Sequence, residues 1–119
     1  MRLVHEPGDG EPTALATTVE TADSLLSKTR GLMFRRSLPD SYALVFRFGT
    51  VANRDVHMLF VFVPLDVLWV REGEVVRVDR LTPWRGYGRS ECDQIVELPA
   101  GGADGVEPGD RVKLVEDEA

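Results

Sequence analysis

Short runs of apolar and β-branched residues, separated by turn-forming residues, are the main pattern along this chain of 119 residues. Runs of this length at nearly even spacing predict β-strands. The predicted strands are Ala14–Glu20, Ala43–Phe48, Val56–Val63, Asp66–Val70, Val75–Leu81, Gln94–Leu98 and Arg111–Val115. Roughly seven short strands predict a mainly-β domain, built as a small barrel or a sandwich.

One segment near the N-terminus has the apolar spacing of a helix. Thr21 or Asp23 can cap this helix, and one face then carries Leu25, Leu26, Thr29, Leu32 and Met33. Gly31 either ends the helix or permits close packing. We therefore expect one helix between the first two strands.

The most hydrophobic stretch, VHMLFVFV (Val56–Val63), is apolar on both faces. A strand of this kind is central and covered on both sides, so we place it between the helix and the barrel interior. His57, at its entry, would lie at the barrel mouth. Further along, REGE (Arg71–Glu74) predicts a tight hairpin in which Gly73 takes the left-handed position.

The two ends of the chain lack this periodicity. Residues 1–13 contain Pro7, Gly8 and Gly10 and are predicted to form a flexible arm, and residues 116–119 an acidic tail. Residues 14–115 then form a single domain, as expected for a chain of this length.

The formal net charge is −6, with 20 acidic against 14 basic residues, which disfavours general binding to nucleic acid or anionic membranes. Only Lys28 and Lys113 are lysines, so 12 of the 14 basic residues are arginines. An acidic chain with this preference for arginine predicts a halophilic source. No apolar run reaches the roughly 20 residues of a membrane span. No apolar leader precedes the domain, and we expect a cytoplasmic protein.

Cysteine and histidine are too few for the common metal sites. Cys92 is the sole cysteine, which excludes an internal disulfide and a cysteine-rich zinc site. Its acidic neighbours, Glu91 and Asp93, should raise the pKa of the thiol. The histidines are His5, in the predicted arm, and His57. We therefore predict no metal site and no cofactor.

Asp66 is the one carboxylate in the longer apolar run VHMLFVFVPLDVLW (Val56–Trp69), directly after Pro64 and Leu65. It can close a turn by accepting backbone N–H groups, or it can serve as a ligand-binding or acid–base carboxylate. Arg30 is the predicted cation for it, because an arginine beside a glycine at a helix end can pair bidentately with a carboxylate or an anionic ligand. Alternatively, Arg30 compensates the helix terminus.

Two further regions are candidates for binding. His57 and Glu97 could line the same pocket as Arg30 and Asp66, although a rim histidine and a solvated strand-end glutamate are the simpler interpretations. TPWRGYGRS (Thr82–Ser90) places Trp84, Arg85 and Tyr87 in a glycine-opened loop. Such a loop can stack on a sugar, a base or a partner, or can fold over one end of the barrel with Trp84 as a plug.

Three blocks of the chain resemble the domain of unknown function 192 family: RGLMFRRSLP (Arg30–Pro39), PLDVLWV (Pro64–Val70) and VELPAGGADGVEPGDRV (Val96–Val112). The resemblance spans roughly residues 14–115 and implies a compact, mainly-β domain with one helix near its start. One departure from the pattern follows Met58. Many members carry polar residues there, whereas this chain has Leu59, Phe60 and Val61.

The resemblance implies no reaction, and three hypotheses stay open. The first is a module that binds a small molecule or a protein partner near Arg30 and Asp66. The second is a structural or interaction protein in which Arg30–Asp66 is only a fold-fixing pair. The third is an enzyme with Asp66 as general acid or base, which is the weakest because no second catalytic group is recognisable.

Overall fold

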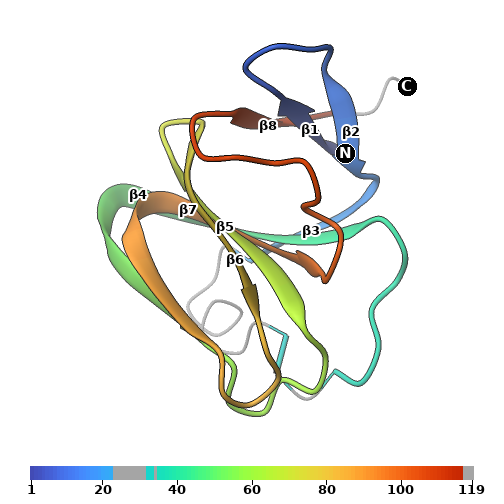
Figure 1. Cartoon of the computed structure of the whole chain (residues 1–119), viewed down its shortest axis with the longest axis vertical. Helices are drawn as coiled ribbons and strands as arrows, with labels where there is room; N and C mark the ends of the chain where they lie inside the picture. The colour runs from blue at the N-terminus through green and yellow to red at the C-terminus, as the bar shows by residue number, and fades with distance from the viewer. Residues whose placement is uncertain (23–31, 34, 117–119) are drawn as a thin grey trace.

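The computed structural model describes residues 1–22, 32–33 and 35–116. These residues form eight β-strands in one sheet (Figure 1). In chain order the strands are β1 (Arg2–Glu6), β2 (Thr13–Ala16), β3 (Thr18–Ala22), β4 (Tyr42–His57), β5 (Leu65–Arg71), β6 (Glu74–Leu81), β7 (Tyr87–Pro99) and β8 (Arg111–Val115). Their order across the sheet is β2-β1-β8-β6-β5-β7-β4-β3, and only β3 and β4 pair in parallel.

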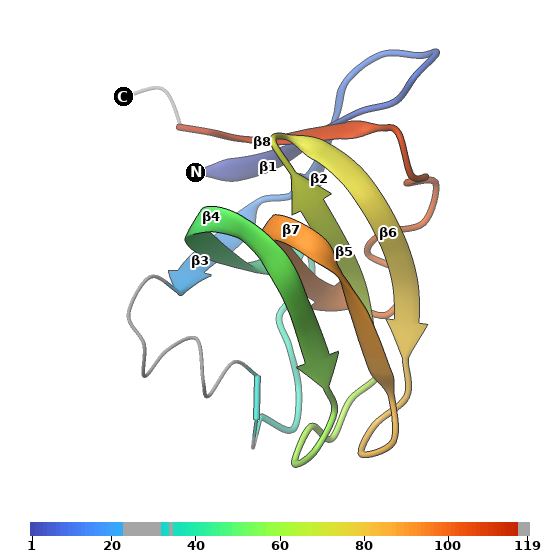
Figure 2. The ribbon, with the colours of Figure 1, turned by 90° about the vertical axis from the view of Figure 1, so that its left-hand side faces the viewer.

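The sheet is strongly curled but open. β2 and β3 are separated along the chain by Thr17 alone, yet they stand at opposite ends of the strand order. The curl therefore brings the two edges near each other, and β1 contacts β3 (Figure 2). Within the described part of the chain no ladder joins β2 to β3. The mainly-β prediction is confirmed, but the architecture is an open sheet and not a closed barrel or a sandwich.

The N-terminal residues belong to the sheet, which differs from the predicted flexible arm. β1 pairs with both β2 and β8. On β1, His5 is buried, and its Nε2 lies 2.8 Å from Oδ2 of buried Asp110, just before β8. Asp110 also accepts the amide of Gly8. The five residues of this strand, RLVHE, contain no alternating pattern, and the glycines and prolines that follow them favoured an arm.

The predicted helix falls mainly on residues 23–31, which lie outside the described residues. Thr21, one of its two predicted caps, is part of β3. Leu32 is buried, and Met33 packs against the core. No helix occurs in the described ranges, and none there could cross a bilayer.

The prediction of a central strand at Val56–Val63 is wrong. β4 ends at His57, and the chain turns over residues 58–63. Phe60 takes a left-handed φ of 61°, and the Val61 amide donates to the Met58 carbonyl at 3.1 Å. Met58 and Val61 are buried, whereas Leu59 and Phe60 are exposed. An apolar run free of glycine resembles a buried strand, and nothing in its pattern marks the turn.

Two apolar clusters cover the two faces of the sheet, and side chains alternate between them along each central strand. On β5, Val67 and Trp69 enter one cluster and Leu68 enters the other. Trp69 is fully buried, and Gly88 leaves room for its ring. The predicted REGE hairpin is confirmed, because Gly73 takes a φ of 84° between β5 and β6.

Candidate functional site

Asp66 is a buried anchor near the start of β5. Its Oδ1 accepts Nε of Arg80 at 2.8 Å, and its Oδ2 accepts Nη2 of Arg80 at 3.3 Å. Oδ2 also accepts the amides of Gly101 and Ala103, both at 3.0 Å. The carboxylate thereby joins β5, β6 and the loop that follows β7.

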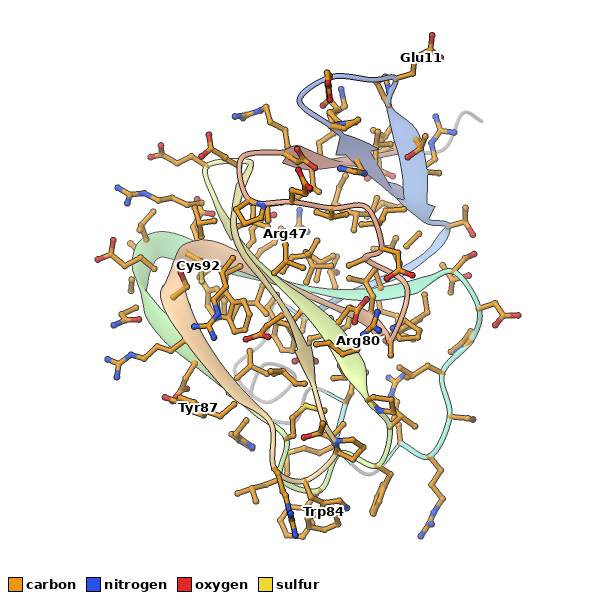
Figure 3. All side chains as sticks on the ribbon, in the orientation of Figure 1. Glu11, Arg47, Arg80, Trp84, Tyr87 and Cys92 are labelled. Atoms are coloured by element: carbon orange, nitrogen blue, oxygen red, sulfur yellow. The ribbon has the colours of Figure 1, made fainter. Side chains whose placement is uncertain are left out.

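These contacts determine the charge state of Asp66. Burial by itself would raise the pKa of the carboxyl, but hydrogen bonds from Arg80, Ala103 and Gly101 outweigh it and lower the pKa. Asp66 is therefore ionised at neutral pH. Arg80 comes from the neighbouring strand, opposite Asp66 in the register. Its side chain is labelled in Figure 3. Arg30, the cation predicted from the sequence, lies outside the described residues.

Glu97 is the second buried carboxylate, on β7 between Leu44 of β4 and Val67 of β5. Its Oε1 is buried without a hydrogen-bond partner. Because burial disfavours the charged form, the pKa of Glu97 is raised to about 7. A solvated strand-end glutamate, the simpler interpretation of the sequence, is thus wrong.

Asp66 and Glu97 face opposite sides of the sheet. Asp66 pairs across β5 and β7 with Leu98, whereas Glu97 pairs with Val67. Leu98 and Val67 belong to the two different apolar clusters. Cross-strand neighbours share a face, so the structure does not bring these two carboxylates together.

Two loops meet at the end of the molecule that lies away from the β1–β2 hairpin. One follows β4, and the other joins β6 to β7 (Figure 2). Met58 connects them, because its amide donates to the Gly86 carbonyl at 3.1 Å and its carbonyl accepts the Trp84 amide at 3.0 Å. This buried residue fixes the position of each loop relative to the other.

Aromatic side chains cover the surface of these loops. The Trp84 ring packs edge-on against Phe60, with 5.2 Å between centroids, and against Phe62, at 5.5 Å. Leu59, Phe60 and Trp84 are exposed to 52%, 43% and 44%. We name this cluster, Leu59, Phe60, Phe62 and Trp84, the aromatic tip. Figure 3 places Trp84 at the opposite end of the molecule from Glu11.

The backbone of the tip is strained. Phe60 has a φ of 61° and Trp84 a φ of 66°, in the left-handed region where bulky side chains are rare. Such strain costs of order 1–3 kcal/mol per residue and concentrates at functional sites. Glycine at both positions would connect the strands without this cost, because glycine takes a left-handed φ without steric strain.

The other predicted site residues surround the tip or lie farther up the strands. His57 is exposed at the end of β4, and its Nδ1 accepts the Leu59 amide at 3.3 Å. Arg85 is exposed beside Trp84. Tyr87 begins β7, contrary to the prediction of a loop, and its hydroxyl donates to Asp55 at 3.1 Å.

Cys92 is buried on β7 and is not part of a site. Burial raises the pKa of its thiol to about 11, with a smaller contribution from Asp93. The predicted direction is confirmed, but burial is the main cause. Across the described ranges, no three histidine, cysteine, aspartate or glutamate side chains gather to hold a metal ion.

Comparison with known proteins confirms the resemblance seen in the sequence. Residues 6–114 match the DUF192 family, described as "Uncharacterized ACR, COG1430". The chain belongs to this family. Two relatives are similar over 85 residues, or 70% of this chain. They are UPF0127 protein TK1120 of Thermococcus kodakarensis, 33% identical, and a UPF0127 protein of Thermococcus gammatolerans, 30% identical. The aligned region is about half of those relatives, 54% and 56% of their lengths.

Two crystal structures share the fold. A candidate transcription regulator from Sinorhizobium meliloti 1021 superposes with a TM-score of 0.85 at 28% identity, over 94% of this chain and 91% of the other. A protein of unknown function from Novosphingobium aromaticivorans gives a TM-score of 0.83 at 22% identity, over 95% and 84%.

The sequence did not identify Arg80 as the partner of Asp66. It also did not identify Leu59, Phe60 and Phe62 as parts of the aromatic tip. Arg80 becomes the partner of Asp66 only through the β5–β6 register. Trp84 was a candidate from its own loop, and the signal for the second loop was the departure from the family pattern after Met58, where the resemblance implies polar residues. Here the exposed segment is apolar instead.

Proposed function

We propose that this chain is a binding module that recognises a macromolecular partner through the aromatic tip. The observation that carries the proposal is the exposure of three large apolar side chains, Leu59, Phe60 and Trp84, on two loops locked together by Met58. Exposed apolar side chains gathered in one place mark interaction sites more often than scattered ones do. Aromatic residues are also the side chains that dominate binding energy at protein interfaces.

The arrangement of the tip supports a preformed surface. Edge-on packing of Trp84 against two phenylalanines restricts all three rings. A partner would therefore lose little side-chain entropy on binding. The left-handed φ angles at Phe60 and Trp84 support the same interpretation, because the loop carries strain while presenting these rings to solvent.

Asp66 fits the fold-fixing hypothesis better than the ligand-binding or catalytic ones. Four hydrogen bonds from protein donors reach its carboxylate. Its lowered pKa keeps it ionised, which disfavours a role as a general acid. The site proposed from the sequence near Arg30 and Asp66 is thus replaced in our proposal by the aromatic tip.

The test compares the wild-type chain with the double variant Phe60→Gly/Trp84→Gly. Glycine accepts the left-handed conformation, so the variant should keep its loops and its thermal midpoint. The control is Val51→Ser, which removes an exposed apolar side chain on β4. A phage-displayed random peptide library, selected on each protein, should enrich binders on the wild type and on Val51→Ser but not on the double variant. Equal enrichment on all three would refute the proposal.

A small-molecule site at Glu97 is the second candidate, favoured by its buried Oε1 without a partner. A ligand with an apolar body and an N–H donor would satisfy that atom. Benzylamine should then raise the melting temperature of the wild type by at least about 2 °C and leave that of Glu97→Met, which has no acceptor at this position, unchanged. Equal shifts in both proteins would eliminate this candidate.

A further inference from the structure

We propose, resting on the function assigned to the aromatic tip, that its partner is a protein segment that combines acidic with apolar side chains. The charges around the tip carry this inference. The guanidinium of Arg36 lies over the Phe62 ring, 5.0 Å from its centroid. Arg85 is adjacent to Trp84 along the chain, and both arginines are exposed.

Two exposed arginines, Arg36 and Arg85, flank the tip in a chain whose formal net charge is −6. Asp55, the carboxylate two residues before His57, accepts a hydrogen bond from the Tyr87 hydroxyl at 3.1 Å. At physiological salt the Debye length is about 8 Å, so the local arginines act on a bound segment more than distant carboxylates do.

The aromatic side chains of the tip and the arginines beside them together favour a partner with both apolar and acidic side chains. An apolar side chain of the partner can pack among the exposed faces of Phe60, Phe62 and Trp84. A neighbouring aspartate or glutamate can then accept charge-assisted hydrogen bonds from Arg36 or Arg85. Contact between Arg36 and the Phe62 ring holds the guanidinium beside the apolar surface, where a carboxylate of the same segment can reach it.

A peptide segment fits these features better than an anionic membrane. The molecule measures 36 × 29 × 26 Å, and a bilayer would extend across the whole end of it. Binding to an anionic membrane typically uses a cluster of about four to eight basic residues, whereas Arg36 and Arg85 are the arginines that flank the tip. Two arginines are enough to pair with the acidic side chains of a short segment.

The first experiment is the sequence analysis of the peptides that the wild-type protein enriches from the random library. We expect aspartate or glutamate beside aromatic or aliphatic residues. In fluorescence-anisotropy titrations, Arg36→Gln/Arg85→Gln should bind such a peptide at least about tenfold more weakly than the wild type. Raising NaCl from about 0.05 to about 0.5 M should weaken binding to the wild type more than to the variant. Arg71→Gln, which removes an exposed arginine on β5, is the matched control and should bind like the wild type.

The outcomes separate this inference from the proposed function. Peptides that need Phe60 and Trp84 but carry no acidic residues, and that bind the arginine variant normally, would overturn the acidic partner while leaving the docking role of the tip intact. If no peptide depends on the tip, both proposals fail. Tip-dependent binding to phosphatidylserine vesicles, or a dimer that Phe60→Gly/Trp84→Gly dissociates in sedimentation, would identify a different occupant and overturn the peptide proposal.

Discussion

Replacement of Glu97 by glutamine tests how strongly the fold opposes a negative charge in its core. The pKa of this carboxyl is raised from an ordinary value of 4.5 to about 7, because it is buried among apolar side chains. This difference corresponds to about 3 kcal/mol, since one unit of pKa is worth about 1.4 kcal/mol. Glutamine keeps the shape of the protonated side chain and does not ionise.

The sign of the effect follows from the two states of the chain. Below a pH of about 4.5, both folded and unfolded chains hold the Glu97 proton, so the wild type has no penalty. Between about 4.5 and about 7 the unfolded chain releases the proton while the folded chain keeps it, and stability falls as the pH rises. Above the folded pKa both states are ionised, and the full loss of about 3 kcal/mol remains.

Urea unfolding at a series of pH values from about 4 to about 8 measures this loss. The free energy of unfolding of Glu97→Gln minus that of the wild type should grow by about 3 kcal/mol across the series. Val51→Ser, which changes an exposed position on β4 and involves no titratable group, is the control and should give a difference that does not depend on pH. A constant difference for Glu97→Gln as well would refute the reasoning.

Three further predictions concern the anchor, the packing and the thiol. Asp66→Ala removes the acceptor of the Gly101 amide and of the buried Ala103 amide, and should cost about 3 kcal/mol in urea unfolding. Arg80→Ala leaves both amides bonded and should cost less; equal losses would contradict the anchoring role. Gly88→Ala would place a methyl group 2.5 Å from a buried tryptophan ring and should lower stability by about 1–3 kcal/mol, whereas Gly49→Ala, with open space around it, should change little in the same assay. Cys92 should not react with Ellman's reagent at about pH 8 until urea is added, because the thiol is buried and its pKa is raised to about 11. Rapid labelling of the folded chain would contradict this burial.

Strand positions could be predicted wherever short alternating runs ended at clear turn residues. The β5–β6 hairpin and β8 were found in this way, because Gly73 and the charged flanks mark their limits. The same method failed at residues 58–63. An apolar run has the pattern of a buried strand whether or not its backbone turns. The turn here is made by Phe60, with a φ of 61°, and a glycine at that position would have indicated the turn in the sequence.

The candidate site depended on distances that no local pattern contains. Asp66 was recognised as an unusual carboxylate, but its partner Arg80 is determined by the register of two strands. Glu97 and Asp66 were grouped because both are acidic and near strand ends, whereas the pleat directs them to opposite faces. Trp84 was identified as a candidate from its loop alone. Its neighbours Phe60 and Phe62 come from a second loop, which only the fold brings against the first.

The chain contains two tryptophans that report on the proposal independently. Trp84 is exposed at the tip, whereas Trp69 is buried, with its indole N–H donating to the Arg54 carbonyl at 3.2 Å. The most direct test is an NMR titration of the labelled protein with a peptide enriched from the library, followed through the two indole N–H signals. The proposed function predicts that the Trp84 signal shifts in a saturable way while the Trp69 signal stays in place. A titration that leaves the Trp84 signal fixed, or moves only that of Trp69, would contradict recognition through the aromatic tip.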